Sequence, residues 1–495
     1  MEVKKTLIIL GFVAVVMTYF FLISQYKQNK KLELASIIKN GINIEEYGVR
    51  GDGITDETEK MQHAIVDAAR KNQVLIVPAK TYVVSPLKYR EPTSSDWWCL
   101  ALPKNAKIYF EPGAVIKLVD DAPDWTRIIV ISEVSNVNLY GHIQVDGSAD
   151  KVTSGNEHMH GIYIYDAKDI FIESAHSYNS YGDNLFIGGT EEHHSENITI
   201  EFYKGVTAGR KNLVIHYVDN LLIHKAILDN TKGGVGNNWS GENSLDLEPD
   251  DFTGNHRFYQ RIDDLTTYGK GNDFTVGIDK RLAEKWVLDI GNFHVTLMEG
   301  PETGIISYAA TVNINKLWVT SHPESHGSGL NLSYGANWVI DEGFFLNGWG
   351  YAISAKASGG EHPTLRLGKI YISRPHGAGV ELWGAAAIIE HLEINDTGGR
   401  ALNILSTTHQ EVEVKNFTIK NSGESELIYV SDYGYEPHVR ISDLVITDNR
   451  NKQIGSVVHL ETKRSVEGFE IENITYPINL KKYSFGPTVE SEIEH

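Results

Sequence analysis

The sequence predicts an all-β chain folded as one parallel β-helix, and three observations support this prediction. Short strands of alternating apolar and polar residues recur at steps of roughly 22 to 27 residues, within the period range of stacked repeats. The 45 glycines suit a chain with many tight turns. Aromatic residues make up 10% of the chain, which argues against disorder. The 495 residues are therefore expected to form one continuous stack rather than several average-sized domains.

Residues 1–31 are predicted to form a cytoplasmic stub and a transmembrane signal anchor. Residues 6–24 are an almost unbroken apolar run, preceded by Lys4 and Lys5, and are long enough to cross a bilayer as a helix. The run ends in bulky residues without the small-residue pattern of a cleavage site. We therefore expect a membrane-anchored protein with an extracytoplasmic body. Secretion after signal cleavage is the alternative.

The β-helix is expected to span residues 32–495 and to begin with an N-terminal cap at residues 42–84. Within the cap, residues 51–53 form a turn, and Asp56 can accept a hydrogen bond from the first turn of the helix that follows. Apolar residues between 61 and 69 give that helix one apolar stripe. Two strands should follow the capping helix, at 74–77 and 82–84.

Two runs in this cap, GDGITDET and VLIVPAKTYVV, resemble the pectate-lyase-like superfamily at their usual spacing. That superfamily includes polygalacturonases, rhamnogalacturonases, epimerase-like proteins and some phage tailspikes. The resemblance implies a right-handed parallel β-helix behind the cap and a polysaccharide substrate. It does not fix the reaction, because the superfamily hosts several chemistries. The NTD, DD, GHG and RIK motifs of polygalacturonases are not found in register here.

The body of the chain supports the same fold through its repeated strands. We expect a first series of strands at 161–165, 184–187, 212–216, 244–248, 304–308 and 329–333, with further copies beginning at Gly350, Gly379, Ala401 and Glu426. A second series lies between them at 169–172, 197–200 and 220–223. The longest gap in the first series suggests an excursion from the stack at residues 251–303. Residues 449–495 are expected to form a C-terminal cap.

Strand alternation predicts which side chains of the first series point away from the core. The apolar pairs should point inward: Ile162 and Ile164, Leu185 and Ile187, Leu213 and Ile215, Leu245 and Leu247. The alternate positions should then line one outer groove, with neighbouring coils about 4.8 Å apart.

Asp246 and Glu248 are the predicted catalytic pair in this groove. Residues two apart on one strand face are separated by roughly 6.6 Å, and inverting glycosidases hold their two carboxyl groups about 6.5 to 9.5 Å apart. Asp183 and Asp250 are predicted to assist them. The pattern therefore favours a glycoside hydrolase that uses paired carboxylates as acid and base.

The remaining groove residues are predicted to bind the sugar. Polar contacts are expected from Arg210, Asn212 and His216. Flat rings bind sugar faces through apolar contact, and the expected rings are Tyr163, Tyr165, Phe186 and Tyr308, with Tyr334 and Trp383 on the same side.

Two alternatives remain open from the sequence. A polyuronate lyase or epimerase would hold Ca²⁺ with Asp246, Glu248 and Asp250, and Arg210 or Lys211 would assist proton abstraction. A non-catalytic glycan-binding β-helix is the other. A hydrolase needs no cofactor, and no other metal site is expected. The formal net charge of -20 excludes a nucleic-acid partner, and a single cysteine, Cys99, excludes an intrachain disulfide framework.

Overall fold

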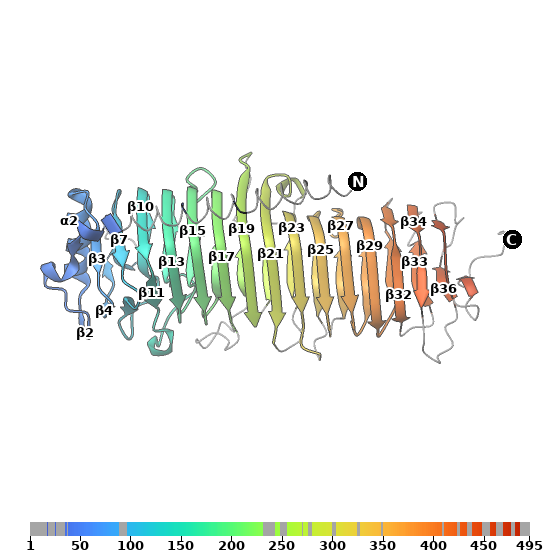
Figure 1. Ribbon diagram of the computed structural model, residues 1–495, viewed down its shortest axis with the longest axis horizontal. Helices are drawn as coiled ribbons and strands as arrows, with labels where there is room; N and C mark the ends of the chain where they lie inside the picture. Colours follow the sequence, from blue (N-terminus) through green and yellow to red (C-terminus); the bar gives the residue numbers. More distant parts are fainter. Residues whose placement is uncertain are drawn as a thin grey trace.

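The computed structural model is an elongated stack of coils that begins at a capping helix and runs in chain order to the other end (Figure 1). The residues it describes are 17, 25, 35–36, 38–88, 97–230, 243–247, 255–269, 271–275, 280–298, 303–323, 327–347, 350–407, 410–422, 426–432, 438–447, 456–461, 469–476 and 481–485. Their strands form two sheets, and the strands pair in parallel apart from β5 with β6. The predicted all-β parallel β-helix is therefore confirmed.

The larger sheet carries the long strands of the stack. In chain order its members are β1 (Ile42–Asn43), β2 (Asp52–Asp56), β3 (Leu75–Val77), β4 (Thr81–Val84), β7 (Lys107–Phe110), β8 (Val115–Leu118), β10 (Ser135–Gly141), β11 (Ile143–Asp146), β13 (Lys168–Tyr178), β15 (Ser195–Val206), β17 (Val218–Asp229), β19 (Phe258–Gly269), β21 (Trp286–Leu297), β23 (Thr311–Thr320), β25 (Asn337–Leu346), β27 (Thr364–Ser373), β29 (Ala386–Thr397), β31 (Glu411–Val414), β32 (Phe417–Ser422), β34 (His438–Ser442), β35 (Val445–Thr447) and β37 (Phe469–Glu472).

The smaller sheet carries the first series of strands foreseen in the sequence. Its members are β5 (Leu87–Lys88), β6 (Trp97–Ala101), β9 (Thr126–Ser132), β12 (Ile162–Tyr165), β14 (Leu185–Gly188), β16 (Lys211–Ile215), β18 (Asn243–Leu247), β20 (Gly271–Thr275), β22 (Ile305–Tyr308), β24 (Ser328–Ser333), β26 (Tyr351–Lys356), β28 (Ala378–Trp383), β30 (Leu402–Ser406), β33 (Glu426–Asp432), β36 (Ser456–Glu461) and β38 (Lys481–Phe485). The described helices are η1 (Ile44–Tyr47), α2 (Thr58–Arg70), η2 (Ala149–Lys151) and η3 (Lys280–Leu282).

Each long strand of the larger sheet bends near its middle. The bend shows in the burial pattern, because two successive residues there point away from the core before the alternation of inward and outward side chains resumes. In β13 the inward positions are Ile170 and Ile172, and after Glu173 and Ser174 they resume at Ala175. The same slip occurs in β15, β17 and β19. The bend turns one sheet into two faces, and together with the smaller sheet these faces enclose the core.

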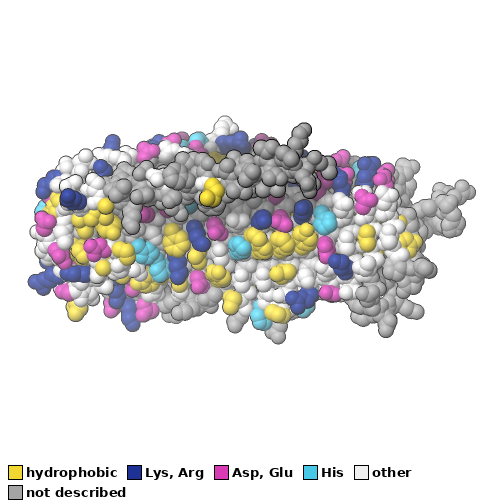
Figure 2. All heavy atoms as spheres, viewed as in Figure 1, with side chains coloured by type: hydrophobic (Ala, Val, Ile, Leu, Met, Phe, Trp, Pro, Cys, Tyr) yellow, Lys and Arg dark blue, Asp and Glu magenta, His cyan; other side chains and the backbone are white. Residues whose placement is uncertain are grey.

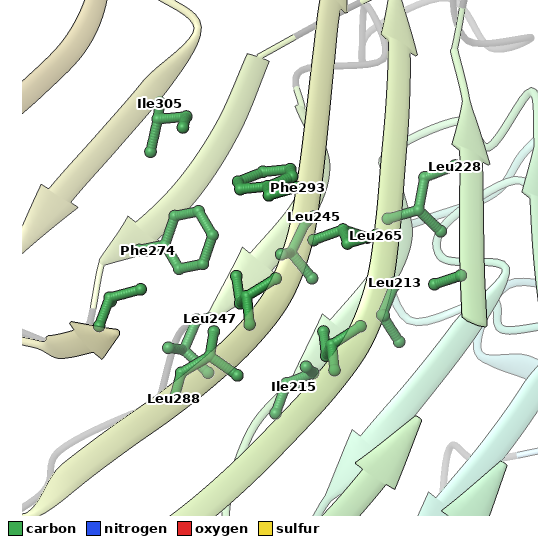
Figure 3. Packing of buried hydrophobic residues seen from close by; sticks show 14 of the residues in the cluster. Leu213, Ile215, Leu228, Leu245, Leu247, Leu265, Phe274, Leu288, Phe293 and Ile305 are labelled. Carbon is green, nitrogen blue, oxygen red and sulfur yellow. The ribbon is translucent and has the colours of Figure 1, made fainter. Parts of the chain in front are cut away.

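The core is a continuous column of apolar side chains from successive coils. The predicted inward pairs, from Ile162 to Leu247, have 0% exposure, so the predicted side-chain direction in the first series is confirmed. Figure 3 shows Leu213 and Ile215 beside Leu245 and Leu247, with side chains of the larger sheet packed opposite them. Close packing of this kind fixes the register of each coil on the next.

Asparagine and aspartate side chains mark one corner of the stack, where the backbone adopts a left-handed conformation. Asp169, Asn197 and Asn220 all have a φ between 53° and 58°, which these residue types tolerate better than most. Their side chains also join the coils: Asn197 Nδ2 donates to Asp169 Oδ1 at 3.0 Å, and Asn220 Nδ2 donates to Asn197 Oδ1 at 2.7 Å. The corner is therefore built from local turn preference and from hydrogen bonds between coils.

An aromatic ladder runs along the outer face of the larger sheet. His294 stacks on Trp318 with ring centroids 4.1 Å apart, and Phe344 and Tyr371 continue the ladder on the next two coils. Figure 2 shows this as a hydrophobic stripe over β21 to β29. The ring faces contact one another, so the ladder stabilises the stacking of coils.

The N-terminal cap follows the predicted order of elements. Helix α2 occupies 58–70, and its buried side includes Met61, Ala64 and Ile65. Asp56 Oδ1 accepts a hydrogen bond from the Thr58 amide at 3.0 Å, so it satisfies a donor at the start of this helix as predicted. The two predicted strands are β3 and β4, which pair with strands of the next coil.

The predicted excursion at 251–303 is wrong for the described residues. Within 251–303, β19 and β21 pair with the larger sheet, and β20 pairs with β18 and β22 of the smaller sheet. Within 449–495, β36 and β38 extend the smaller sheet and β37 extends the larger one. The described residues of 251–303 are therefore coils of the stack, whereas the C-terminal cap at 449–495 stays a prediction. Charged and aromatic residues on the outer positions of β19 and β21 concealed the alternation in the sequence.

The predicted anchor at residues 6–24 lies outside the described residues except for Met17, so it stays a prediction. Within the described part of the chain, no helix combines the length and the apolar character needed to span a membrane.

Candidate functional site

A cavity of about 720 Å³ opens on the outer face of the smaller sheet, over β12, β14 and β16. Aromatic, basic and acidic side chains share its wall. The described lining residues are Arg127, Glu157, His158, His160, Tyr163, Tyr165, Phe186, Gly189, Thr190, Glu191, Glu192, Arg210, Val214, His216 and Tyr217.

The strand register explains why charged groups meet at one edge of this cavity. Ile162 pairs with Ile129 on one side and with Leu185 on the other. The residues two positions earlier in the chain are Arg127, His160 and Asp183, and backbone hydrogen bonds from Ile128 to His160 and from Gly161 to Asp183 keep them side by side. The following coil contributes Arg210 and Lys211 at the same edge, since Asn184 N donates to Lys211 O.

Asp183 is the centre of a buried polar network. Its side chain is 0% exposed, and His160 Nδ1 lies 3.2 Å from its Oδ2. Arg210 contacts the same oxygen at 3.4 Å, and the Lys211 amide donates to Oδ1 at 3.2 Å. A buried carboxylate needs such partners, because an unpaired charge in the interior is very unfavourable.

Arg210 links this network to a second carboxylate and to the cavity rim. Its Nη2 lies 3.7 Å from Asp246 Oδ2, and its Nε lies 3.6 Å from Glu157 Oε2. Lys211 Nζ also lies 3.3 Å from Asp246 Oδ2. One guanidinium group therefore holds two buried carboxylates, Asp183 and Asp246, in the same site.

Two glycine contacts fix the turn that carries Arg210. A Cβ at Gly209 would lie 1.8 Å from Tyr181 O, and one at Gly182 would lie 2.1 Å from Glu157 O. The Gly209 amide also donates to Ser180 O at 2.8 Å, and the Arg210 amide donates to Gly182 O at 3.0 Å. The turns before β14 and β16 thus stack more closely than any residue with a side chain would allow.

Aromatic rings form the wall beside the charged edge. The His160 ring stacks on Tyr163 at 5.3 Å and on Phe186 at 5.2 Å. Tyr163 stacks in turn on Tyr165 at 5.5 Å, and the Arg127 guanidinium lies 4.1 Å from the centre of the Tyr163 ring. This packing holds the imidazole in one orientation.

Burial sets the protonation states of the central pair. Desolvation lowers the pKa of His160 to about 4, against the opposing effect of Asp183. Burial alone would raise the pKa of Asp183, but Arg210, His160 and Lys211 together hold it below its ordinary value. At neutral pH the site therefore contains a neutral imidazole beside an ionised carboxylate.

The structure brings most of the predicted site residues together. Asp183, Arg210, His216, Tyr163, Tyr165 and Phe186 lie in or directly behind the cavity wall. Asp246 projects away from the core as predicted, but it is only 2% exposed, beside its register partner Val214 of the cavity wall. Glu248 and Asp250 lie outside the described residues. Tyr308 lies on the same sheet but not among the described cavity-lining residues, and it packs against Tyr334.

The prediction that Asn212 binds substrate is wrong. Its side chain is 0% exposed, and its Oδ1 accepts a hydrogen bond from Asn184 Nδ2 at 2.7 Å. Its partner Asn184, which directly precedes β14, is equally buried. Both residues lie near the start of their strands, where the chain leaves a corner of the stack. The alternation of inward and outward side chains is established only further along each strand.

Sequence reasoning missed the role of His160, together with Arg127 and Glu157. The available signal was register: His160 stands two residues before Ile162, as Asp183 stands two residues before Leu185.

Among the described residues, no group of three or more His, Cys, Asp or Glu side chains is arranged to hold a metal ion. Of the three proposed Ca²⁺ ligands only Asp246 is described, and two cationic side chains already contact its carboxylate. Those cations would repel Ca²⁺, so the described part of the site does not fit the calcium alternative.

Comparisons with known proteins agree with the fold and the cap. Residues 41–90 match the family model of rhamnogalacturonase A/epimerase, pectate lyase-like proteins. YclG, an uncharacterised protein of Bacillus subtilis (strain 168), is 21% identical over 226 residues, which are 42% of this chain and 38% of YclG. This chain therefore spans much less than two thirds of that relative.

Two solved structures illustrate the structural similarity. The pre-mature gene product 12 of bacteriophage phi29 is 14% identical, with a TM-score of 0.55 over 90% of this chain and 58% of its own. The A-module of the mannuronan C-5 epimerase AlgE6 from Azotobacter vinelandii is 15% identical, with a TM-score of 0.46 over 90% of this chain and 99% of its own. Similarity at this identity concerns the fold alone. The cap carries the sequence signature of the rhamnogalacturonase A/epimerase, pectate lyase-like family, and the resemblance predicted from its two sequence runs is confirmed.

Proposed function

We propose that the protein is a polysaccharide-active enzyme that processes a uronate-containing polysaccharide by acid–base chemistry in the cavity. The observation that carries the proposal is the contact between His160 and the buried Asp183 at the cavity edge. The name of the family matched by the cap, rhamnogalacturonase A/epimerase, pectate lyase-like, supports the substrate class.

His160 has the properties of a general base. Its imidazole is neutral at physiological pH, because burial lowers its pKa to about 4. Asp183 Oδ2 lies 3.2 Å from Nδ1, so a proton on Nδ1 is stabilised by this carboxylate and, in the proposed mechanism, the lone pair is on Nε2. A carboxylate that fixes the tautomer in this way is a common support for a catalytic histidine.

The surrounding side chains suit a sugar that bears a carboxylate. Arg127 and Arg210 line the cavity and can bind an acidic group. Tyr165 also lines it, and burial raises the pKa of this phenol, which therefore keeps its proton. A base, guanidinium groups and a proton donor are the parts that proton abstraction beside a carboxylate requires.

The proposed reaction starts when His160 removes the proton from the ring carbon that bears the uronate carboxylate. The electron pair left on that carbon can expel the neighbouring glycosidic oxygen, which takes a proton from Tyr165. This elimination leaves an unsaturated sugar. Alternatively the carbon regains a proton on its opposite face, which inverts that centre without cleaving the chain.

Hydrolysis is the second candidate, and one observation favours it. Arg210 contacts both Asp183 and Asp246, so the site contains two carboxylates, as glycoside hydrolases do. The lowered pKa of Asp183 makes it a base rather than a proton donor in that scheme. The acid would come from another carboxyl group, and the sequence pairs Asp246 with Glu248 as acid and base without dividing the two roles.

A panel of pectate, rhamnogalacturonan, alginate and a neutral β-glucan distinguishes these reactions. Elimination is expected to produce near-ultraviolet absorbance from an unsaturated sugar on one uronate polymer, and EDTA should leave the rate unchanged. New reducing ends without that absorbance would select hydrolysis. Inversion without cleavage would appear as a changed proton spectrum of the polymer. If no member of the panel is altered, the proposed substrate class is wrong.

We further propose that residues 6–24 anchor the protein in a membrane, with the β-helix on the extracytoplasmic side. The long apolar run supports this proposal. The protein should remain in the membrane pellet after a high-pH carbonate wash, and protease added outside intact cells should degrade the body. Complete release into the wash, or a body that the protease cannot reach, would contradict the anchor or its orientation.

A further inference from the structure

A second cluster of polar and aromatic side chains lies on the outer face of the smaller sheet, far from the cavity. Glu381 and Asp246 occupy the same register position on strands of the smaller sheet. The residues at this position on the strands between them are Asp273, Ile306, Asn331 and Ser354. Asp246 and Glu381 are therefore five strand spacings apart, or about 24 Å along the stack. The two sites are thus separate but share one face.

Glu381 is the centre of this cluster. In strand register it lies between Ser354 and Asn403 of the neighbouring strands, and their side chains, with that of Tyr351, stabilise its ionised carboxylate. The side chain remains partly exposed, so solvent or a ligand can reach it. Burial nevertheless outweighs this stabilisation and raises its pKa. The carboxyl group is therefore partly buried beside polar side chains.

Two cationic side chains flank Glu381, and each lies on an aromatic ring. Lys356 Nζ is 4.0 Å from the centre of the Trp383 ring, and Arg400 Cζ is 4.1 Å from the centre of the Tyr429 ring. Arg400 is paired with Glu426 at 3.6 Å. Lys356 is exposed, and its charge acts on the Glu381 carboxylate.

The hydrogen bonding of the cluster is incomplete within the described residues. The Oδ1 atom of Asn403 and the Nε atom of Arg400 are buried and have no partner there. Each of these two atoms can still form a hydrogen bond with a ligand or a water molecule.

We propose that Glu381, Asn403, Lys356 and Trp383 form a second binding site for a uronate unit of a polysaccharide. Lys356 binds the sugar carboxylate, and Glu381 with Asn403 binds its hydroxyl groups. Trp383 supplies apolar contact with the ring. The ligand class rests on the proposed function. Because the site shares a face with the cavity, one polymer chain can occupy both, and the second site then raises the affinity for long chains.

The test counts binding sites for a short probe, tetragalacturonate or a tetramer of alginate, by titration calorimetry. The full chain carrying His160→Ala is used so that turnover does not consume the probe. Two sites are expected. Trp383→Ala or Lys356→Ala should weaken one of them at least about tenfold and leave the other unchanged. In the parent protein, Trp383→Ala should raise KM for the polymer while kcat stays constant.

Matched controls come from the outer face of the larger sheet. Trp318 is also a partly buried tryptophan on an outer face, and Lys316 is a surface lysine paired with Glu342. Trp318→Ala and Lys316→Ala should leave both sites intact. The proposal is overturned if neither probe binds a site that depends on Trp383 and Lys356. Loss of this binding would leave the proposed function untouched. The proposed function fails if the parent protein alters no polymer, even when a probe still binds at Trp383 and Lys356.

Discussion

Replacing His160 by alanine is expected to lower kcat by about 10²- to 10⁴-fold, the usual contribution of a general base. The reason is geometric: the imidazole is the only neutral base that Asp183 holds at the cavity edge among the described residues. Steady-state rates on the polymer identified by the panel measure the loss. Because Asp183 keeps Arg210 and Lys211 as partners, the variant should remain folded.

His176→Ala is the matched control for this experiment. His176 also has a pKa lowered to about 4 by burial, but it lies on β13 of the larger sheet beside Tyr178. Its replacement removes a similar side chain outside the cavity and should leave kcat unchanged. If the His160 variant kept the parent rate while both proteins melted alike, His160 would not be the base and the mechanism would have to be abandoned.

The second large effect is a loss of stability as the pH falls from about 6.5 to about 4. Over this range His160 binds a proton in the unfolded chain but not in the folded one, because its folded pKa is lowered to about 4. The unfolded state therefore binds more protons, and the free energy of unfolding decreases as the pH is lowered. The shift corresponds to about 3 kcal/mol for this one residue.

Asp183 acts in a lower pH range. Its folded pKa lies below its ordinary value, so its contribution is present above pH 4 and is lost only as the pH falls further, through that folded pKa. Urea unfolding at a series of pH values separates the two effects. In His160→Ala the decrease between pH 6.5 and 4 should be smaller by about 3 kcal/mol. An identical pH profile in parent and variant would show that His160 is not buried in its neutral form.

The sequence by itself determined the fold because the fold depends on local patterns. Alternation in segments such as 162–165 and 185–188 specifies which side faces the core, and a regular repeat lets each coil pack on the next. The cap was recognisable for the same reason, since its turn, helix and strands are contiguous in the chain. Alternation also placed Asp246 on the outer side of its strand, flanked by two buried leucines.

Only the tertiary structure decided which residues meet in the site. His160, Asp183 and Arg210 belong to three coils, and the loops between those coils differ in length, so a fixed period could not align them. The alternation rule also failed at the corners of the stack. Counting from Leu213, Asn212 should point outward, but its side chain turns inward near the start of its strand. The direction of a side chain depends on the local backbone. Which residues of two coils meet depends on how the strands of those coils are aligned, and packing of the whole core sets that alignment.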